Sequence, residues 1–173
     1  MRLWGNSTME YDSFFDHREH AIADLLPISR NQIAPLPNPY HILRTMLTLN
    51  FRPADAALDQ REAAIATFFT LNKIVGVITK AARERMPDPR VPVYGIKSSY
   101  GSTEIEVFPN PARPDRLQAT WVREALLGTM IYCAEEGWGQ RTIEIHHDVL
   151  GYIGDIDFSR LLAKNARVQG SRR

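Results

Sequence analysis

The chain has 173 residues, a hydrophobic fraction of 44%, a charged fraction of 24% and a formal net charge of +1 at pH 7. This length fits one hydrophobic core, and this composition lies far from the low hydrophobicity and high net charge of disordered chains. Nearly balanced charge provides no general attraction for a phosphate backbone or an anionic membrane, so we expect neither nucleic acid nor membrane as a partner.

Two further features bear on location. Cys133 is the single cysteine, so these residues cannot form an intramolecular disulfide. The first residues lack the apolar segment of a secretory signal, and we expect no run of the about 18 apolar residues that a membrane-spanning helix needs. A cytoplasmic location is therefore predicted.

Residues 1–39 are predicted to form an amphipathic helix and a proline-rich connector. Ser7 and Glu10 have the spacing of a capping box, which begins a helix. Pro27 ends the pattern, and prolines at 35, 37 and 39 favour an extended connector. One side of this helix is an apolar stripe, which could pack on the core or on another subunit. Its apolar residues are Tyr11, Phe14, Phe15, Ile22, Leu25 and Leu26.

Residues 40–51 fit two patterns. Leu47, Leu49 and Phe51 alternate as in a strand, whereas Ile42 and Met46 fit a helix, and we favour the strand. Residues 54–86 give the clearest helical pattern, because apolar side chains recur three and four residues apart until Pro87. A capping box at Asp59 and Glu62 would start this helix later.

A hairpin and a second helix follow. Residues 91–97 and 103–108 are short runs rich in β-branched and aromatic side chains, separated by a turn that ends at Gly101. Residues 117–136 are helical in pattern and apolar on more than one side, and Gly137 stands where a C-terminal cap is needed.

Residues 141–158 predict a second hairpin, with a turn near His147 and Asp148 and with Tyr152, Ile156 and Phe158 in the alternation of a strand. The fold class is therefore α+β, an antiparallel sheet of four or five strands with two main helices on one face. Its order is either the ferredoxin-like βαββαβ plus an extra strand or α-ββ-α-ββ. We expect one domain over residues 40–158 and a basic tail over 159–173.

The best candidate for a catalytic site is the tip of the second predicted hairpin, with Glu144, His146, His147 and Asp148. Imidazoles and carboxylates are the groups that transfer protons near neutral pH. If the strand continues through them, His146 and His147 point to opposite faces and cannot share a metal ion. A polar turn in which Asp148 bonds to the backbone is the plainer interpretation.

Four more carboxylates alternate with apolar residues, and they crowd one side of the sheet if their strands are neighbours: Glu104, Glu106, Asp155 and Asp157. The plainer interpretation is a solvated face balanced by Lys97 and Arg141. The alternative is a pair of carboxylates with separated pKa values that act as acid and base.

No phosphate-binding loop, dinucleotide fingerprint, serine-hydrolase elbow or cysteine pair is present in the sequence. We therefore expect no cofactor and no metal, and we favour a non-catalytic interaction or assembly domain that forms a homo-oligomer or binds a protein partner. The alternative is a small cofactor-independent isomerase, cyclase or hydrolase that binds an organic small molecule and uses the histidines and carboxylates above.

Overall fold

A computed structural model describes residues 35–161. The predicted N-terminal helix and most of the basic tail lie outside the described residues. The described elements follow in chain order: β1 (Tyr40–His41), β2 (Leu47–Phe51), α2 (Gln60–Arg83), β3 (Ile96–Tyr100), β4 (Thr103–Pro109), α3 (Ala119–Glu136), β5 (Arg141–His147) and β6 (Gly151–Arg160).

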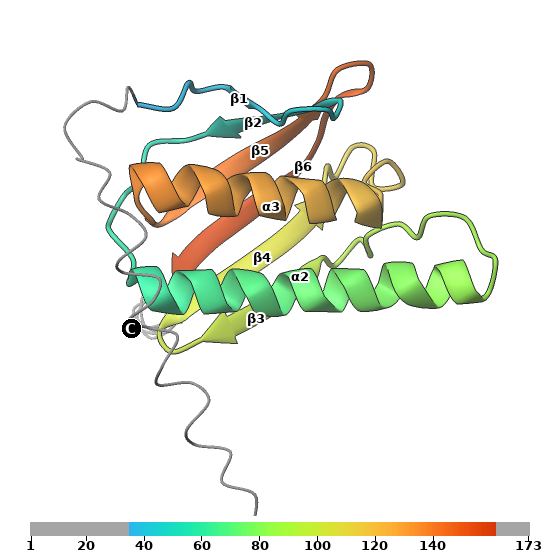
Figure 1. The fold of residues 1–173 in the computed structure, drawn as a ribbon, viewed down its shortest axis with the longest axis horizontal. Helices are drawn as coiled ribbons and strands as arrows, with labels where there is room; N and C mark the ends of the chain where they lie inside the picture. Colours follow the sequence, from blue (N-terminus) through green and yellow to red (C-terminus); the bar gives the residue numbers. More distant parts are fainter. Residues whose placement is uncertain (1–34, 162–173) are drawn as a thin grey trace, which may run out of the picture. The chain divides into compact units, whose positions relative to one another are not determined.

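The strands form one antiparallel sheet in the order β1-β2-β5-β6-β4-β3, and both helices lie on one face of it (Figure 1). The α+β class is confirmed, but the sheet has six strands instead of four or five, because residues 40–51 form a hairpin of two strands. The ferredoxin-like order is not confirmed. Three strands separate β2 from β3, whereas a split βαβ unit has one between them.

The start of α2 is decided by its cap. Asp59 lies in an extended conformation and its carboxylate accepts the backbone N–H of Glu62 at 2.8 Å, so the later of the two predicted starts is correct. Residues 54–58 instead continue the pairing of β2 with β5, for example through the N–H of Leu58 and the carbonyl of Trp138 at 3.1 Å. At the far end of α3, Gly137 has φ 91 and its N–H bonds the carbonyl of Cys133 at 3.0 Å, as predicted.

The first predicted hairpin is displaced along the sequence. The expected strand from residue 91 is wrong, since Val91 bonds the carbonyl of Leu117 at 2.9 Å and β3 begins only at Ile96. The turn lies at Gly101, which has φ 57 and packs so closely on the carboxylate of Glu62 that a Cβ atom would come within 2.1 Å of it. Glycine is needed here for both reasons.

The core lies between the helices and one face of the sheet. Its sheet side consists of side chains that alternate along the strands, and the helices contribute small and branched residues that allow close approach. Fully buried examples are Leu49, Ile105, Val107, Ile143, Ile145 and Ile156 on the strands and Ala66, Ile74, Val122 and Leu126 on the helices. We call this the covered face of the sheet and the opposite side the open face.

Helix α2 corrects one expectation from the sequence. Its 24 residues include a window with a hydropathy of 1.3, so by length and composition alone it could cross a membrane. The same helix packs on the covered face through Ala63, Ala66 and Ile74, each with no exposed surface. The core helix of a globular domain meets the same criterion, so the finding is weak evidence for a span.

Candidate functional site

The predicted catalytic residues do not converge on one point. Glu144 and His146 lie on the open face, where His146 Nε2 is 3.2 Å from Glu144 Oε2. His147 lies on the covered face, 8% exposed, with its ring 4.6 Å from that of Trp121 on α3. Asp148 is exposed in the turn after β5. The structure therefore brings together one acid and one imidazole of the predicted four.

Three cross-strand pairs line the open face along β5 and β6, and we call them the polar strip. They are Thr142 with Asp157, Glu144 with Asp155, and His146 with Tyr152. A register shift beside His146 leaves Ile153 as an extra residue in β6, which is a β-bulge. Tyr152 was predicted on the same face as Ile156 and Phe158, but the bulge moves it to the open face, beside Asp155.

The carboxylates of β4 stand next to the strip, as the alternation in the sequence predicts. Glu106 pairs directly with Asp157, and Glu104 pairs with Ser159. Lys97 Nζ balances Glu104 at 2.7 Å, although the Glu104 side chain is only 3% exposed. Arg141 stands opposite Phe158 in the register, and its Nη2 reaches the carbonyl of Gly137 at 3.5 Å; its role in balancing the carboxylates stays a prediction.

Glu144 is held in its ionised form. It accepts hydrogen bonds from the guanidinium of Arg52, whose Nε lies at 3.0 Å, and from Asn50 Nδ2 at 3.0 Å. These bonds, those of Arg52 above all, hold the pKa of Glu144 below its ordinary value of 4.5, against a smaller opposing effect of burial. Glu144 is therefore a fixed negative charge in the middle of the strip.

Asp155, its cross-strand neighbour, is shifted in the opposite direction. The residue is 8% exposed, and burial raises the pKa of its carboxyl above the ordinary value of 3.8, although the Tyr152 hydroxyl donates a hydrogen bond to Oδ2. Burial and the same bond to Asp155 also raise the pKa of Tyr152. The pKa values of two adjacent carboxyl groups are thus shifted in opposite directions from their ordinary values.

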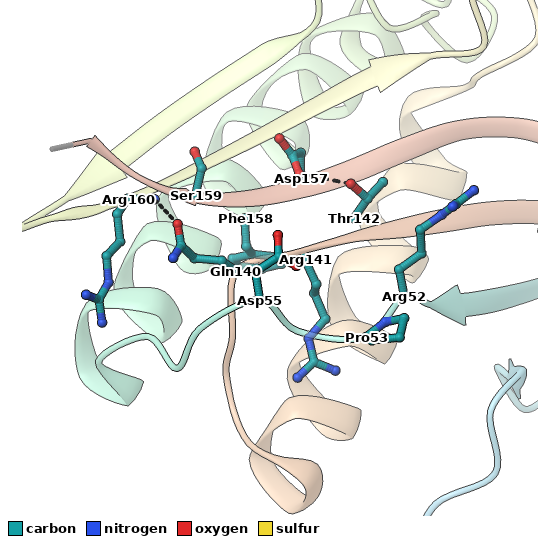
Figure 2. A pocket seen from close by; sticks show the side chains of 10 residues that line it. All are labelled: Arg52, Pro53, Asp55, Gln140, Arg141, Thr142, Asp157, Phe158, Ser159 and Arg160. Carbon is teal, nitrogen blue, oxygen red and sulfur yellow. Dashed lines mark hydrogen bonds between the residues drawn. The ribbon is translucent and has the colours of Figure 1, made fainter. Parts of the chain in front are cut away.

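A cavity of about 530 Å³ adjoins one end of the strip (Figure 2). Thr142 and Asp157 belong to both, and the Thr142 hydroxyl donates to Asp157 Oδ1 at 3.1 Å; Arg52, which binds Glu144 of the strip, also lines the cavity. The remaining lining residues come from the loop after β2 and from the ends of β5 and β6: Pro53, Asp55, Gln140, Arg141, Phe158, Ser159 and Arg160. The wall combines polar and apolar surface in similar amounts, and the cavity is open to solvent.

Sequence reasoning missed Asn50, Arg52 and Tyr152. Alternation with Leu49 and Phe51 places Asn50 on the polar side of its strand, but only the pairing of β2 with β5 puts it beside Glu144. Within residues 35–161, no group of three or more histidine, cysteine or acidic side chains has the arrangement of a metal site.

What the strip can do chemically follows from these shifts. It presents a carboxylate whose pKa is lowered, a carboxyl group whose pKa is raised above that of an ordinary aspartate, a phenol and an imidazole within a few residues of one another on neighbouring strands. These are components of acid–base chemistry on a small molecule. Comparison with family models, with curated proteins and with solved structures finds no match for this chain.

Proposed function

We propose that this protein is an assembly domain that pairs with a second copy of itself through the outer face of its two helices. The observation that carries the proposal is a set of apolar side chains that point away from the sheet. Their exposed fractions are 51% for Phe68 and 41% for Val75 on α2, and 40% for Leu127 and 56% for Ile131 on α3. We call these four residues the outer helix face.

The position of these side chains supports one shared surface. Helices α2 and α3 lie side by side over the sheet (Figure 1). Phe68 and Val75 are seven residues apart, and Leu127 and Ile131 are four apart, so each pair lies on one side of its helix. Clustered apolar surface of this kind is typical of protein interfaces, whereas single exposed apolar residues are ordinary.

Charge favours a second copy as the occupant. Among its charged residues α2 has Arg61, Lys73, Lys80 and Arg83 against Glu62. Helix α3 has the opposite balance, with Glu124, Glu135 and Glu136 against Arg123. A two-fold axis that lays α2 of one copy across α3 of the other brings unlike charges together on both sides of the axis. The open face offers no such match, because a two-fold pairing through it would bring the carboxylates of one copy against those of the other.

The test is the mass of the full-length chain in solution over a wide concentration range, by sedimentation velocity. We expect a dimer that Ile131→Glu and Phe68→Glu weaken by about tenfold or more, since each buries a charge in an apolar contact. Val93→Glu is the matched control, because Val93 is 72% exposed outside the helices. A wild-type chain that stays monomeric at every concentration contradicts the proposal.

Acid–base catalysis on the polar strip is the second candidate function. It is favoured by the opposite pKa shifts of Glu144 and Asp155, which sit across from each other beside the 530 Å³ cavity. In this role Asp155 holds the transferable proton, Glu144 stabilises developing positive charge, and the reaction is an isomerisation, cyclisation or hydrolysis of an organic molecule.

Carboxyl ¹³C NMR titration tests the premise of this second candidate. We expect Asp155 to titrate above its ordinary value of 3.8 and Glu144 below its ordinary value of 4.5, and Arg52→Met to move the Glu144 midpoint upward because its principal hydrogen-bond donor is lost. Arg160→Met, which changes an arginine of the same cavity that bonds the carbonyl of Ala57, is the matched control. Midpoints at the ordinary values of both carboxyl groups, or shifts in the same direction, would remove the basis for assigning them different roles.

A further inference from the structure

We infer that a second cavity, on the covered side of the sheet beside His147, binds a small organic carboxylate with an apolar body. We call it the His147 cavity. Its volume is about 370 Å³, and it is lined by Leu43, Arg44, Thr45, Met46, Leu47, Trp121, Glu124 and His147. The inference does not depend on self-association or on chemistry at the polar strip.

The first support is the hydrogen bonding of His147. Its Nδ1 accepts the backbone N–H groups of Val149 at 3.2 Å and Leu150 at 3.4 Å. An accepting Nδ1 carries no hydrogen, so the ring proton of the neutral imidazole sits on Nε2. Within residues 35–161 this Nε2 makes no hydrogen bond to a protein group, and it is accessible from the cavity instead of being sealed in the core. A ligand oxygen that enters the cavity can replace water as the acceptor of this N–H.

The second support is the apolar wall. The Trp121 ring packs at 4.6 Å from the imidazole, and Leu47 closes the inner side. Leu43 and Met46 remain 82% and 58% exposed at the rim, where a ligand body would cover them. Sites for small molecules generally combine such walls with a few polar groups that fix orientation.

The third support is charge. Glu124 is paired with Arg123 at 2.5 Å, whereas Arg44 has no ion-pair partner among the described residues. A carboxylate satisfies Arg44 and the Nε2–H of His147 together. A neutral ligand would satisfy only the imidazole, and an ammonium group would be repelled by Arg44.

The loop that carries Arg44 is held in place. Arg44 has φ 63, a left-handed conformation that is uncommon for arginine, and the loop is closed by the bond from Ile42 N–H to the carbonyl of Leu47 at 3.0 Å. The N–H of Asp148 bonds the carbonyl of Met46 at 2.9 Å, which ties this loop to the turn after β5. Both turns lie at the end of the sheet where α3 begins (Figure 1). Backbone strain of this type is concentrated at functional sites.

The test is an ¹H–¹⁵N NMR titration of the full-length chain with benzoate, benzyl alcohol and benzylammonium, which share a ring and differ in charge. We expect saturable shifts with benzoate at residues 43–47, at the Trp121 indole and at His147. Benzyl alcohol should bind about tenfold more weakly, because the charge-assisted bond is missing. Absence of saturable shifts with benzoate, or equal binding of all three probes, overturns the inference.

Substitutions separate the two polar contacts. In His147→Asn the side-chain oxygen can keep the bonds to the turn, while the Nε2 donor is lost, so benzoate affinity should fall about tenfold with the turn intact. Arg44→Gly removes the cation and relaxes the backbone, and it should reduce affinity for benzoate but not for benzyl alcohol. Arg85→Gly is the matched control, since Arg85 also has a positive φ, 54, at the end of α2. Unchanged benzoate affinity in either cavity variant contradicts the assignment.

Discussion

The two faces of the sheet use the same strands for opposite purposes. On β5 the covered side presents Ile143 and Ile145, both without exposed surface, while the residue between them, Glu144, points to the open side. On β6, Ile156 is fully buried next to Asp155 on the opposite face. Alternate residues of one strand therefore belong to a dry core and to a charged network.

The two faces stabilise the fold in different ways. The covered face stabilises the fold because folding removes its apolar surface from water. This contribution to the free energy of folding depends on buried area and packing and hardly on pH. The open face depends on pairing between charged groups that are partly withdrawn from water. Whether such a group stabilises or destabilises the fold depends on its protonation state and on its partner. Substitutions on the two faces should consequently differ in size and in pH dependence.

The largest effect should come from the covered face. Ile145→Ala removes a fully buried side chain and leaves a cavity, which should lower the free energy of unfolding by about 2–5 kcal/mol. Urea denaturation measures it, with Val93→Ala as the control because Val93 is 72% exposed and lies outside the proposed interface. Equal losses in the two variants would show that the two faces do not differ as described.

A smaller loss is expected for the ion pair of the open face. Lys97→Met removes the ammonium group that lies 2.7 Å from the nearly buried carboxylate of Glu104 and should cost about 1–3 kcal/mol. Lys80→Met on α2, which has no ion pair among residues 35–161, is the matched control. High salt should narrow the gap between the wild type and Lys97→Met, because Lys97 is half exposed. Identical stability in the two variants would mean that Glu104 does not need this partner.

The smallest effects should be those of protonation, and they should have opposite signs. Glu144 has a lowered pKa, so its contribution to stability is present above its ordinary value of 4.5 and is lost as the pH falls through its lower folded value. Asp155 has a raised pKa, so its contribution is present below its ordinary value of 3.8 and is lost as the pH rises through its higher folded value.

Thermal denaturation of two isosteric variants at a series of pH values tests the direction of each group's contribution to stability. Glu144→Gln should reduce stability at neutral pH, and its difference from the wild type should shrink on acidification. Asp155→Asn should gain stability relative to the wild type as the pH rises, since no buried charge is formed. Parallel curves for the wild type and both variants would show that folding shifts the pKa of neither carboxyl group.

Local signals were sufficient for most elements of the fold. Asp59 with Glu62, and Gly137, mark helix ends through hydrogen bonds made within one turn, and both positions are correct in the structure. The strand expected from Val91 does not form. Pro92 within it cannot donate a hydrogen bond to a neighbouring strand, and the N–H of Val91 instead bonds the carbonyl of Leu117.

The candidate site was predictable only in part. Glu144 and His146 were found from their chemical types and their spacing of two, which places them on one side of a strand. Asn50 and Arg52 complete the network from a strand more than 90 residues earlier in the chain. No local pattern in the sequence specifies the register of β2 against β5, because it depends on which strands pair in the folded sheet.

The sequence alone thus determined the covered face, because apolar alternation and helix caps act through contacts between residues that are close along the chain. Tertiary structure decided the open face. The bulge at Ile153 shows why: Tyr152 and Asp155 are three residues apart and would lie on opposite sides of a regular strand. The extra residue is imposed by pairing with β5, and it alone brings the phenol to the carboxyl group whose pKa is raised.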